Sequence, residues 1–141
     1  MPLRIMCFIA MAALAGCGSG AAPLPTVKDA RQALTDGLTA WKAARPSSSL
    51  AEVTPKIDFV DFEWKAGKVL SDFTIGSDAA DQGTQTFSVS LTVAGEPKAK
   101  DVKYMVLGLD PVHIYRDEDY TRAMNMEDGP APSKTQAKTR R

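Results

Sequence analysis

Apolar and polar positions change their spacing along this chain, and the change separates one helical segment from a series of strands. Between residues 26 and 45, apolar side chains recur every three or four positions, which is the spacing of one helix face. These side chains are Val27, Ala30, Leu34, Leu38 and Trp41. Thr26 and Asp29 have the form of a capping box, and Pro46 disfavours helical geometry in the residue before it. The pattern predicts one helix from about Val27 that ends by Arg45.

From residue 57 onward the apolar spacing shortens to every second position, which indicates β-strands. The clearest strand covers residues 84–93, where apolar and hydroxyl side chains alternate strictly. Further strands are expected over residues 57–60, 69–75, 101–109 and 112–115. In the second of these, Val69, Phe73 and Ile75 are expected to share one face. The polar segments 76–83 and 94–100 indicate a loop and a hairpin loop.

Residues 61–67 fit two structures, because their apolar spacing matches neither period well. They could continue the preceding strand, or they could form one helical turn. The helical turn is the favoured prediction. In it, Asp61 caps the turn and Gly67 ends it.

One helix followed by strands with short links predicts an α+β fold. The expected architecture is one N-terminal helix packed on a curved antiparallel sheet of about four strands. The order of elements resembles the cystatin-like and NTF2-like classes, although the Gln-x-Val-x-Gly loop of cystatin inhibitors is missing. The pattern AWKAA…LAEV…IDFVDFEWKAG…DFTI…VKYMVLGLDPVHIYRDE also resembles uncharacterised small exported bacterial proteins over residues 30–118, and that resemblance implies no function.

The predicted strand 101–109 is apolar on both faces, unlike the strand before it. Val102, Tyr104 and Val106 lie on one face, and Met105, Leu107 and Leu109 lie on the other. A central position in the sheet, or a C-terminal segment folded over it, is the favoured explanation. A sheet-to-sheet homodimer or a ligand groove remains open.

The N-terminus has the layout of a signal peptide, with Arg4 followed by an apolar run over residues 5–14. The segment Leu14-Ala15-Gly16-Cys17 resembles the lipobox of bacterial lipoproteins. That resemblance implies cleavage between Gly16 and Cys17 and a diacylglyceryl group on the Cys17 thiol. Asp after the cysteine often signals inner-membrane retention in such proteins, so Gly18 favours the outer membrane, with the side not determined. A plain secreted protein is the alternative.

These features divide the chain into four parts: a signal peptide (1–16), a lipidated cysteine with a flexible tether (17–25), a single α+β domain (26–118) and a disordered tail (119–141). Cleavage leaves 141 − 16 = 125 residues, with 17 − 1 = 16 basic and 17 acidic side chains. The near-neutral balance argues against a nucleic-acid partner. Cys7 leaves with the signal peptide and Cys17 carries lipid, so neither a disulfide nor a cysteine-based metal site is expected, and no cofactor is indicated.

Candidate chemistry is sparse. His113 is the only histidine, and Asp58, Asp61 and Asp72 could line the open end of an NTF2-like cone as acid and base. Trp64 could plug that opening. The candidate pocket residues are therefore Asp61, Trp64, Asp72 and His113. For each of them a structural role, as cap, core or surface residue, is favoured.

Two functions follow. The favoured one is a membrane-anchored envelope lipoprotein with a small non-catalytic binding or structural domain, whose partners are the membrane, through Cys17, and an envelope protein; a homodimer is allowed. The alternative is a small enzyme or ligand-binding protein with a pocket between helix and sheet. A filled core under the helix would favour the first function. A cavity with converging carboxylates, or His113 paired with an acid, would favour the second.

Overall fold

The computed structural model describes residues 24–125. The expected signal peptide, the lipobox, most of the tether and residues 126–141 lie outside this range. The chain order is α1 (Val27–Lys42), η1 (Ser47–Glu52), β1 (Ile57–Val60), α2 (Phe62–Lys65), β2 (Leu70–Asp81), β3 (Thr84–Val93), β4 (Lys100–Leu107), β5 (Val112–Arg116) and α3 (Asp117–Asn125).

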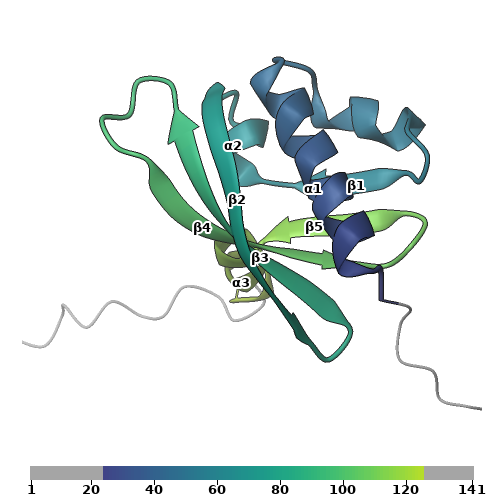
Figure 1. Cartoon of the computed structure of the whole chain (residues 1–141). Helices are drawn as coiled ribbons and strands as arrows, with labels where there is room; N and C mark the ends of the chain where they lie inside the picture. The colour runs from purple at the N-terminus through teal and green to yellow at the C-terminus, as the bar shows by residue number, and fades with distance from the viewer. Residues whose placement is uncertain (1–23, 126–141) are drawn as a thin grey trace, which may run out of the picture.

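The fold is α+β, with helix α1 packed across one face of a five-stranded sheet (Figure 1). The strand order is β1-β5-β4-β3-β2. Strands β2 to β5 form an antiparallel meander, and β1 pairs with β5 in parallel. The expected antiparallel arrangement of about four strands is thus confirmed for β2 to β5, and it is wrong for β1, which adds a fifth strand in parallel. A parallel pair needs a long connection, and the segment from β1 through β2, β3 and β4 to β5 supplies it.

Helix α1 forms as its apolar spacing and its cap predict. The Thr26 side chain accepts a hydrogen bond from the Asp29 N–H at 3.1 Å, and α1 ends at Lys42. Its buried side chains include Ala30, Leu34, Leu38 and Trp41, but Val27 is exposed and does not belong to the packed face. The periodic pattern therefore overestimates the packed face by one residue at its N-terminal end.

Strand β2 differs most from the expectation. It runs on to Asp81 through the predicted loop 76–83, and only Gln82 and Gly83 form the turn to β3. Both turn residues have positive φ, as a two-residue hairpin turn of the right twist requires. The strand is polar here because both of its faces are exposed, while main-chain pairing with β3 holds it in place.

The apolar face of β2 also begins one residue later than expected. Leu70 is buried, whereas Val69 is 52% exposed. A register shift between Leu70 and Asp72 reverses the alternation, so Leu70 lies on the same face as the half-buried Phe73 and Ile75. A bulge of this kind depends on pairing with β3, which the spacing within β2 does not report.

Residues 61–67 adopt the helical turn. The Asp61 side chain caps α2, and Gly67 follows it with a φ of 82°.

The expected C-terminal boundary of the domain, residue 118, is wrong. Helix α3 extends to Asn125 and contacts β4 and β5, and its Asp119 is buried, so residues 119–125 belong to the folded domain.

The core lies between α1 and the sheet. It is built from the inward side chains of all five strands, from the apolar face of α1, from Leu50 of η1 and from Trp64 of α2. The two-faced strand β4 is central, lying between β3 and β5, and its Met105 and Leu107 are half-buried. This position agrees with the favoured explanation for its apolar character.

Candidate functional site

The structure places the four candidate pocket residues in three separate regions. Asp61 and Trp64 belong to the α2 turn, where both are buried. Asp72 lies on β2, 67% exposed, and pairs with Lys42 at 2.9 Å. His113 lies on β5 and faces away from the core. The residues therefore do not form one pocket.

Asp61 is the most constrained carboxylate. It follows β1 directly, and only 1% of its surface is exposed. One carboxylate oxygen accepts hydrogen bonds from the N–H groups of Glu63 (2.8 Å) and Trp64 (3.1 Å). The other accepts from the Tyr104 hydroxyl at 2.6 Å, and Arg116 lies 3.8 Å away. The side chain thus joins the α2 turn to β4 and β5.

Burial is the main influence on the pKa values of Asp61 and Tyr104. Burial raises the pKa of Asp61 above its usual value, and the hydrogen bonds from Tyr104 and Trp64 and the charge of Arg116 only partly offset that rise. Burial also raises the pKa of Tyr104 well above its usual value, with the charge of Asp61 adding to the effect. The Tyr104 hydroxyl therefore acts as a donor to the carboxylate.

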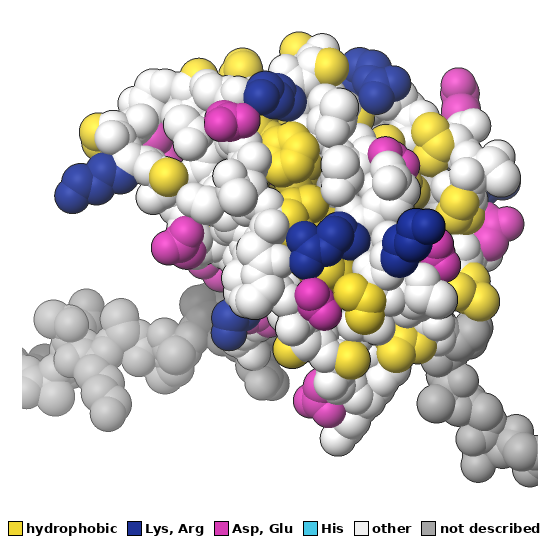
Figure 2. Space-filling view, in the orientation of Figure 1, with side chains coloured by type: hydrophobic (Ala, Val, Ile, Leu, Met, Phe, Trp, Pro, Cys, Tyr) yellow, Lys and Arg dark blue, Asp and Glu magenta, His cyan; other side chains and the backbone are white. Residues whose placement is uncertain are grey.

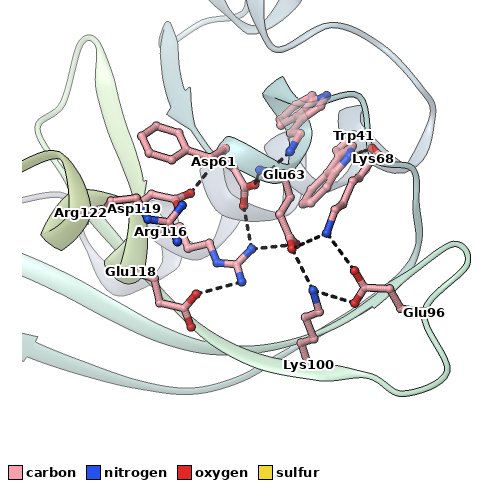
Figure 3. Close-up of polar contacts among 12 residues, drawn as sticks. Trp41, Asp61, Glu63, Lys68, Glu96, Lys100, Arg116, Glu118, Asp119 and Arg122 are labelled. Carbon is pink, nitrogen blue, oxygen red and sulfur yellow. Dashed lines mark hydrogen bonds and ion pairs between the residues drawn. The ribbon is translucent and has the colours of Figure 1, made fainter. Parts of the chain in front are cut away.

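A layer of ion pairs surrounds Asp61 (Figure 3). Arg116, which is buried, donates to Glu63 at 3.0 Å and to Glu118 at 3.2 Å. Glu63 also accepts from Lys68 and Lys100, each at 2.8 Å. Burial raises the pKa of Glu63, but its hydrogen bonds from Lys100, Lys68 and Arg116 outweigh burial and lower the pKa to about 2.

The network also reaches helix α3 (Figure 3). Asp119 accepts a hydrogen bond from the Phe62 N–H at 2.8 Å, so it caps α2 beside Asp61. Arg122 lies 3.9 Å from Asp119 and 5.8 Å from the centre of the Phe62 ring. These contacts explain why the first turns of α3 belong to the domain.

Sequence reasoning missed Arg116, which is the centre of this network. A signal for it exists, because Arg116 continues the alternation of Val112 and Ile114, which are both buried. A charged residue in phase with buried positions must find a partner, since an unpaired buried charge is very costly. The identity of that partner, however, depends on the position of α2.

Trp64 belongs to an aromatic cluster beneath α1. Its ring stacks on Trp41, with centroids 5.6 Å apart, and Phe59 contacts both Trp64 and Tyr104 edge-on. The indole N–H groups of Trp41 and Trp64 donate to the carbonyls of Lys68 and Arg45. These side chains therefore fill the space between the helix and this part of the sheet, and Trp41 and Trp64 also border a surface hollow of about 260 Å³.

His113 does have an acidic partner. Its Nδ1 lies 3.1 Å from an Asp58 carboxylate oxygen, because the parallel register places the two residues side by side. The His113 ring also stacks on Tyr115. The pair lies at the surface, with the His113 side chain 34% and the Asp58 side chain 55% exposed.

One face of the domain is electrically mixed. Acidic and basic side chains alternate over the face shown in Figure 2, without a region of a single sign. Shallow hollows lie along β1 (about 420 Å³), beside α3 (about 330 Å³) and at the start of α1 (about 310 Å³). Such openings suit contact with another molecule more than they suit reactions that require water to be excluded.

The site and the fold define an α+β domain whose interior between α1 and the sheet is packed with apolar and aromatic side chains. No protein-family model matches the chain, and no curated protein matches it. Among residues 24–125, none of the helices has the length and apolar character needed to cross a membrane.

Proposed function

We propose that this protein is an envelope lipoprotein, tethered to a membrane through lipid on Cys17, whose small domain binds a partner rather than catalysing a reaction. The single observation that supports a non-catalytic domain is the hydrogen bonding of the buried Asp61 carboxylate. Both oxygens of this buried carboxylate are occupied by the α2 cap and by Tyr104. An acid–base group must be able to reach a substrate, and this carboxylate is held inside the core.

The filled interior supports the same proposal. A pocket between helix and sheet would require space where Trp41, Phe59, Trp64 and Tyr104 contact one another. These side chains occupy that region and connect α1 to the sheet. Binding is therefore assigned to the surface of the domain.

The membrane half of the proposal depends on the segment Leu14-Ala15-Gly16-Cys17 and the apolar run before it. Two or more acyl chains hold a protein stably at a membrane, whereas a single chain does so only marginally. Helix α1 begins at Val27, ten residues after Cys17. Ten residues span at most about 36 Å, so a lipid on Cys17 would keep the domain close to the bilayer, with the outer membrane favoured.

Replacing the lipidated cysteine tests the anchor. For Cys17→Ala we expect loss of fatty-acid labelling and release of the protein from the membrane fraction. Cys7→Ala is the matched control, because that cysteine lies in the proposed signal peptide and should not affect labelling of the mature protein. Unchanged membrane retention of Cys17→Ala would contradict the lipoprotein assignment.

We also propose that the domain belongs to the cystatin-like or NTF2-like class. Support comes from the long helix on one face of a meander and from the bulged strand β2. The parallel β1–β5 pair departs from an all-antiparallel sheet. A solved structure of a relative with the strand order of this sheet would test the assignment.

The alternative function, a small enzyme or ligand-binding protein, is favoured by one observation, the His113–Asp58 pair. The pair is solvent-exposed and could take part in surface chemistry. The measurement that separates the two functions is the NMR signal of the His113 ring during a screen of small molecules. A saturable shift would support the alternative, and its absence would support the binding domain.

A further inference from the structure

Strand β1 is an edge strand, and some of its main-chain N–H and C=O groups point away from the sheet. The Val112 N–H donates to the Lys56 carbonyl at 2.7 Å, and residues 57–60 pair with 112–115 in parallel. In a parallel ladder, alternate residues direct their main-chain groups to the partner strand. Asp58 and Val60 therefore face β5, while Ile57 and Phe59 direct their N–H and C=O groups away from the sheet.

These outward groups lie along a groove. The hollow of about 420 Å³ is bordered on one side by β1 and on the other by Ser47, Ser48 and Ala51 of η1. Within residues 24–125, the main-chain hydrogen bonds outside regular elements include none from η1 to Ile57 or Phe59. The side chains of both residues pack in the core, which holds their main chain in place. Main-chain groups without a partner on an open edge are a template for pairing with another chain.

The charge along the groove indicates what kind of partner fits. Lys56 and Lys65 both border it. The lysine ion pairs found in the described part of the chain belong to Lys42, Lys68 and Lys100. Lys65 lies over the Phe62 ring, with its Nζ 5.9 Å from the ring centre, and this contact leaves its charge open to a carboxylate. The one acidic side chain on this border, Asp58, already has His113 as its neighbour.

We propose that the β1 edge is a docking site for an extended, acidic segment of a partner polypeptide, which adds to the sheet as a sixth strand. The N–H and C=O groups of Ile57 and Phe59 supply the main-chain pairing, and Lys56 and Lys65 select for carboxylates. This inference rests on the proposed binding function and names its partner class. It does not depend on the lipid anchor.

A second copy of the chain fits this edge poorly. Two β1 strands related by a two-fold axis that use Ile57 and Phe59 equally would place Asp58 directly opposite its own copy. Like charges directly opposite one another destabilise a strand pair. The charge pattern therefore favours a different polypeptide over self-association.

The test uses the purified full chain in detergent and dye-labelled peptides of alternating valine and glutamate. One peptide carries N-methyl groups on the residues that face β1, and a matched peptide carries them on the other residues. N-methylation removes donors without altering the protein. We expect it to weaken binding about tenfold or more in the first case, since two hydrogen bonds are lost, and to have little effect in the second.

Substitutions in the protein give a second readout. Lys56→Ala and Lys65→Ala should each weaken binding of the valine–glutamate peptide several-fold, whereas Lys103→Ala, an exposed lysine on β4, should not. Ala51→Trp should block the groove, and Ser88→Trp, on an exposed position of β3, is its control. A circular dichroism spectrum like that of the parent chain would show that each variant is folded.

Three results would overturn the proposal. They are no binding of the valine–glutamate peptide, equal tolerance of both N-methylated peptides, and concentration-dependent dimerisation in sedimentation that Ala51→Trp abolishes. The last would assign the edge to a second copy. Because the anchor is tested separately through Cys17, failure of peptide binding with intact membrane attachment would contradict this inference alone.

Discussion

The two edge strands of the sheet, β1 and β2, differ in how far they are protected against pairing with another strand. Edge strand β2 is twelve residues long but carries two register shifts, and Arg31 of α1 donates to the Gly76 carbonyl at 2.9 Å and pairs with Asp78 at 3.2 Å. Edge strand β1 is only four residues long, is regular, and borders a groove. Bulges and charges are common protections against unwanted pairing, and they are concentrated on β2.

The comparison shows that length alone does not determine which edge is available. The long edge is twisted by its bulges and carries Asp72, Asp78 and Asp81. The short edge is held in place by two side chains. Asp61, directly after the strand, bonds to Tyr104, and Phe59, within the strand, packs in the core. Shortness also limits unwanted pairing, but β1 has no bulge, so its outward main-chain groups form an ordered surface for an added strand, whereas the long edge is protected against one.

The largest expected effect comes from releasing the end of β1. Asp61→Ala removes the α2 cap and leaves the buried Tyr104 hydroxyl without its acceptor, while Arg116 keeps its hydrogen bonds to Glu63 and Glu118. We expect the free energy of unfolding in urea to fall by about 2–4 kcal/mol, the sum of a lost helix cap and a buried hydroxyl left without an acceptor. Asp58→Ala, on an exposed position of the same strand, should change it by less than about 0.5 kcal/mol. Equal effects of the two substitutions would contradict the anchoring role of Asp61.

The second effect concerns the fit of β1 beneath α1. A Cβ on Gly37 would clash with the Phe59 ring, which is enclosed by Trp64 and Tyr104. Gly37→Ala should therefore destabilise the protein by about 1–3 kcal/mol through overpacking. Helix propensity alone predicts stabilisation by about 1 kcal/mol. A double-mutant cycle with Phe59→Ala checks the cause, because removing the ring should restore the propensity gain.

The third effect is a dependence on acid. The pKa of Glu63 is lowered from 4.5 to about 2, so its stabilising contribution is present above about pH 4.5 and is lost as the pH falls towards 2. The raised pKa of Asp61 acts in the opposite sense, because protonation there favours the folded state. Glu63→Gln should lower the unfolding free energy at pH 7 by about 1–2 kcal/mol, since it weakens charged hydrogen bonds. It should also flatten the acid limb, and an unchanged acid limb would contradict this role.

The smallest expected effect comes from opening the β2 edge. Arg31→Ala removes the contacts with Gly76 and Asp78 and with the ring of Phe87. Because Arg31 is partly exposed, the loss of stability should be only about 0.5–1 kcal/mol. Hydrogen exchange should nevertheless become faster in residues 75–78, while Lys28→Ala on the same helix leaves it unchanged. Equal exchange rates in the two variants would remove Arg31 from the protection of this edge.

Much of the local structure could be predicted from the sequence. The Thr26 cap, the strict alternation of residues 84–93, and the Asp61 cap with Gly67 after the turn depend only on nearby residues, and the structure confirms each of them. The predicted loop at 76–83 was wrong, because polarity reports solvent exposure rather than the absence of main-chain pairing. Helix α3 was missed because its buried contacts are polar ones made by Asp119.

The candidate site was predictable only in part. Asp61 and Trp64 were recognised and do lie together, but Asp72 and His113 belong to other surfaces. Spacing along the chain could not identify Tyr104 and Arg116 as the partners of Asp61. These residues lie 43 and 55 positions from Asp61, and they meet it only because β1 inserts beside β5.

The sequence by itself determined the helix with its cap, the strands with strict alternation, the α2 turn and the near-neutral charge, because each depends on the composition or on residues a few positions apart. Only the tertiary structure decided the parallel placement of β1, the bulges of β2, the close approach of Gly37 to Phe59 and the pairing of Arg116. Each of these depends on which distant segments meet when long loops close. Local spacing contains no record of that choice.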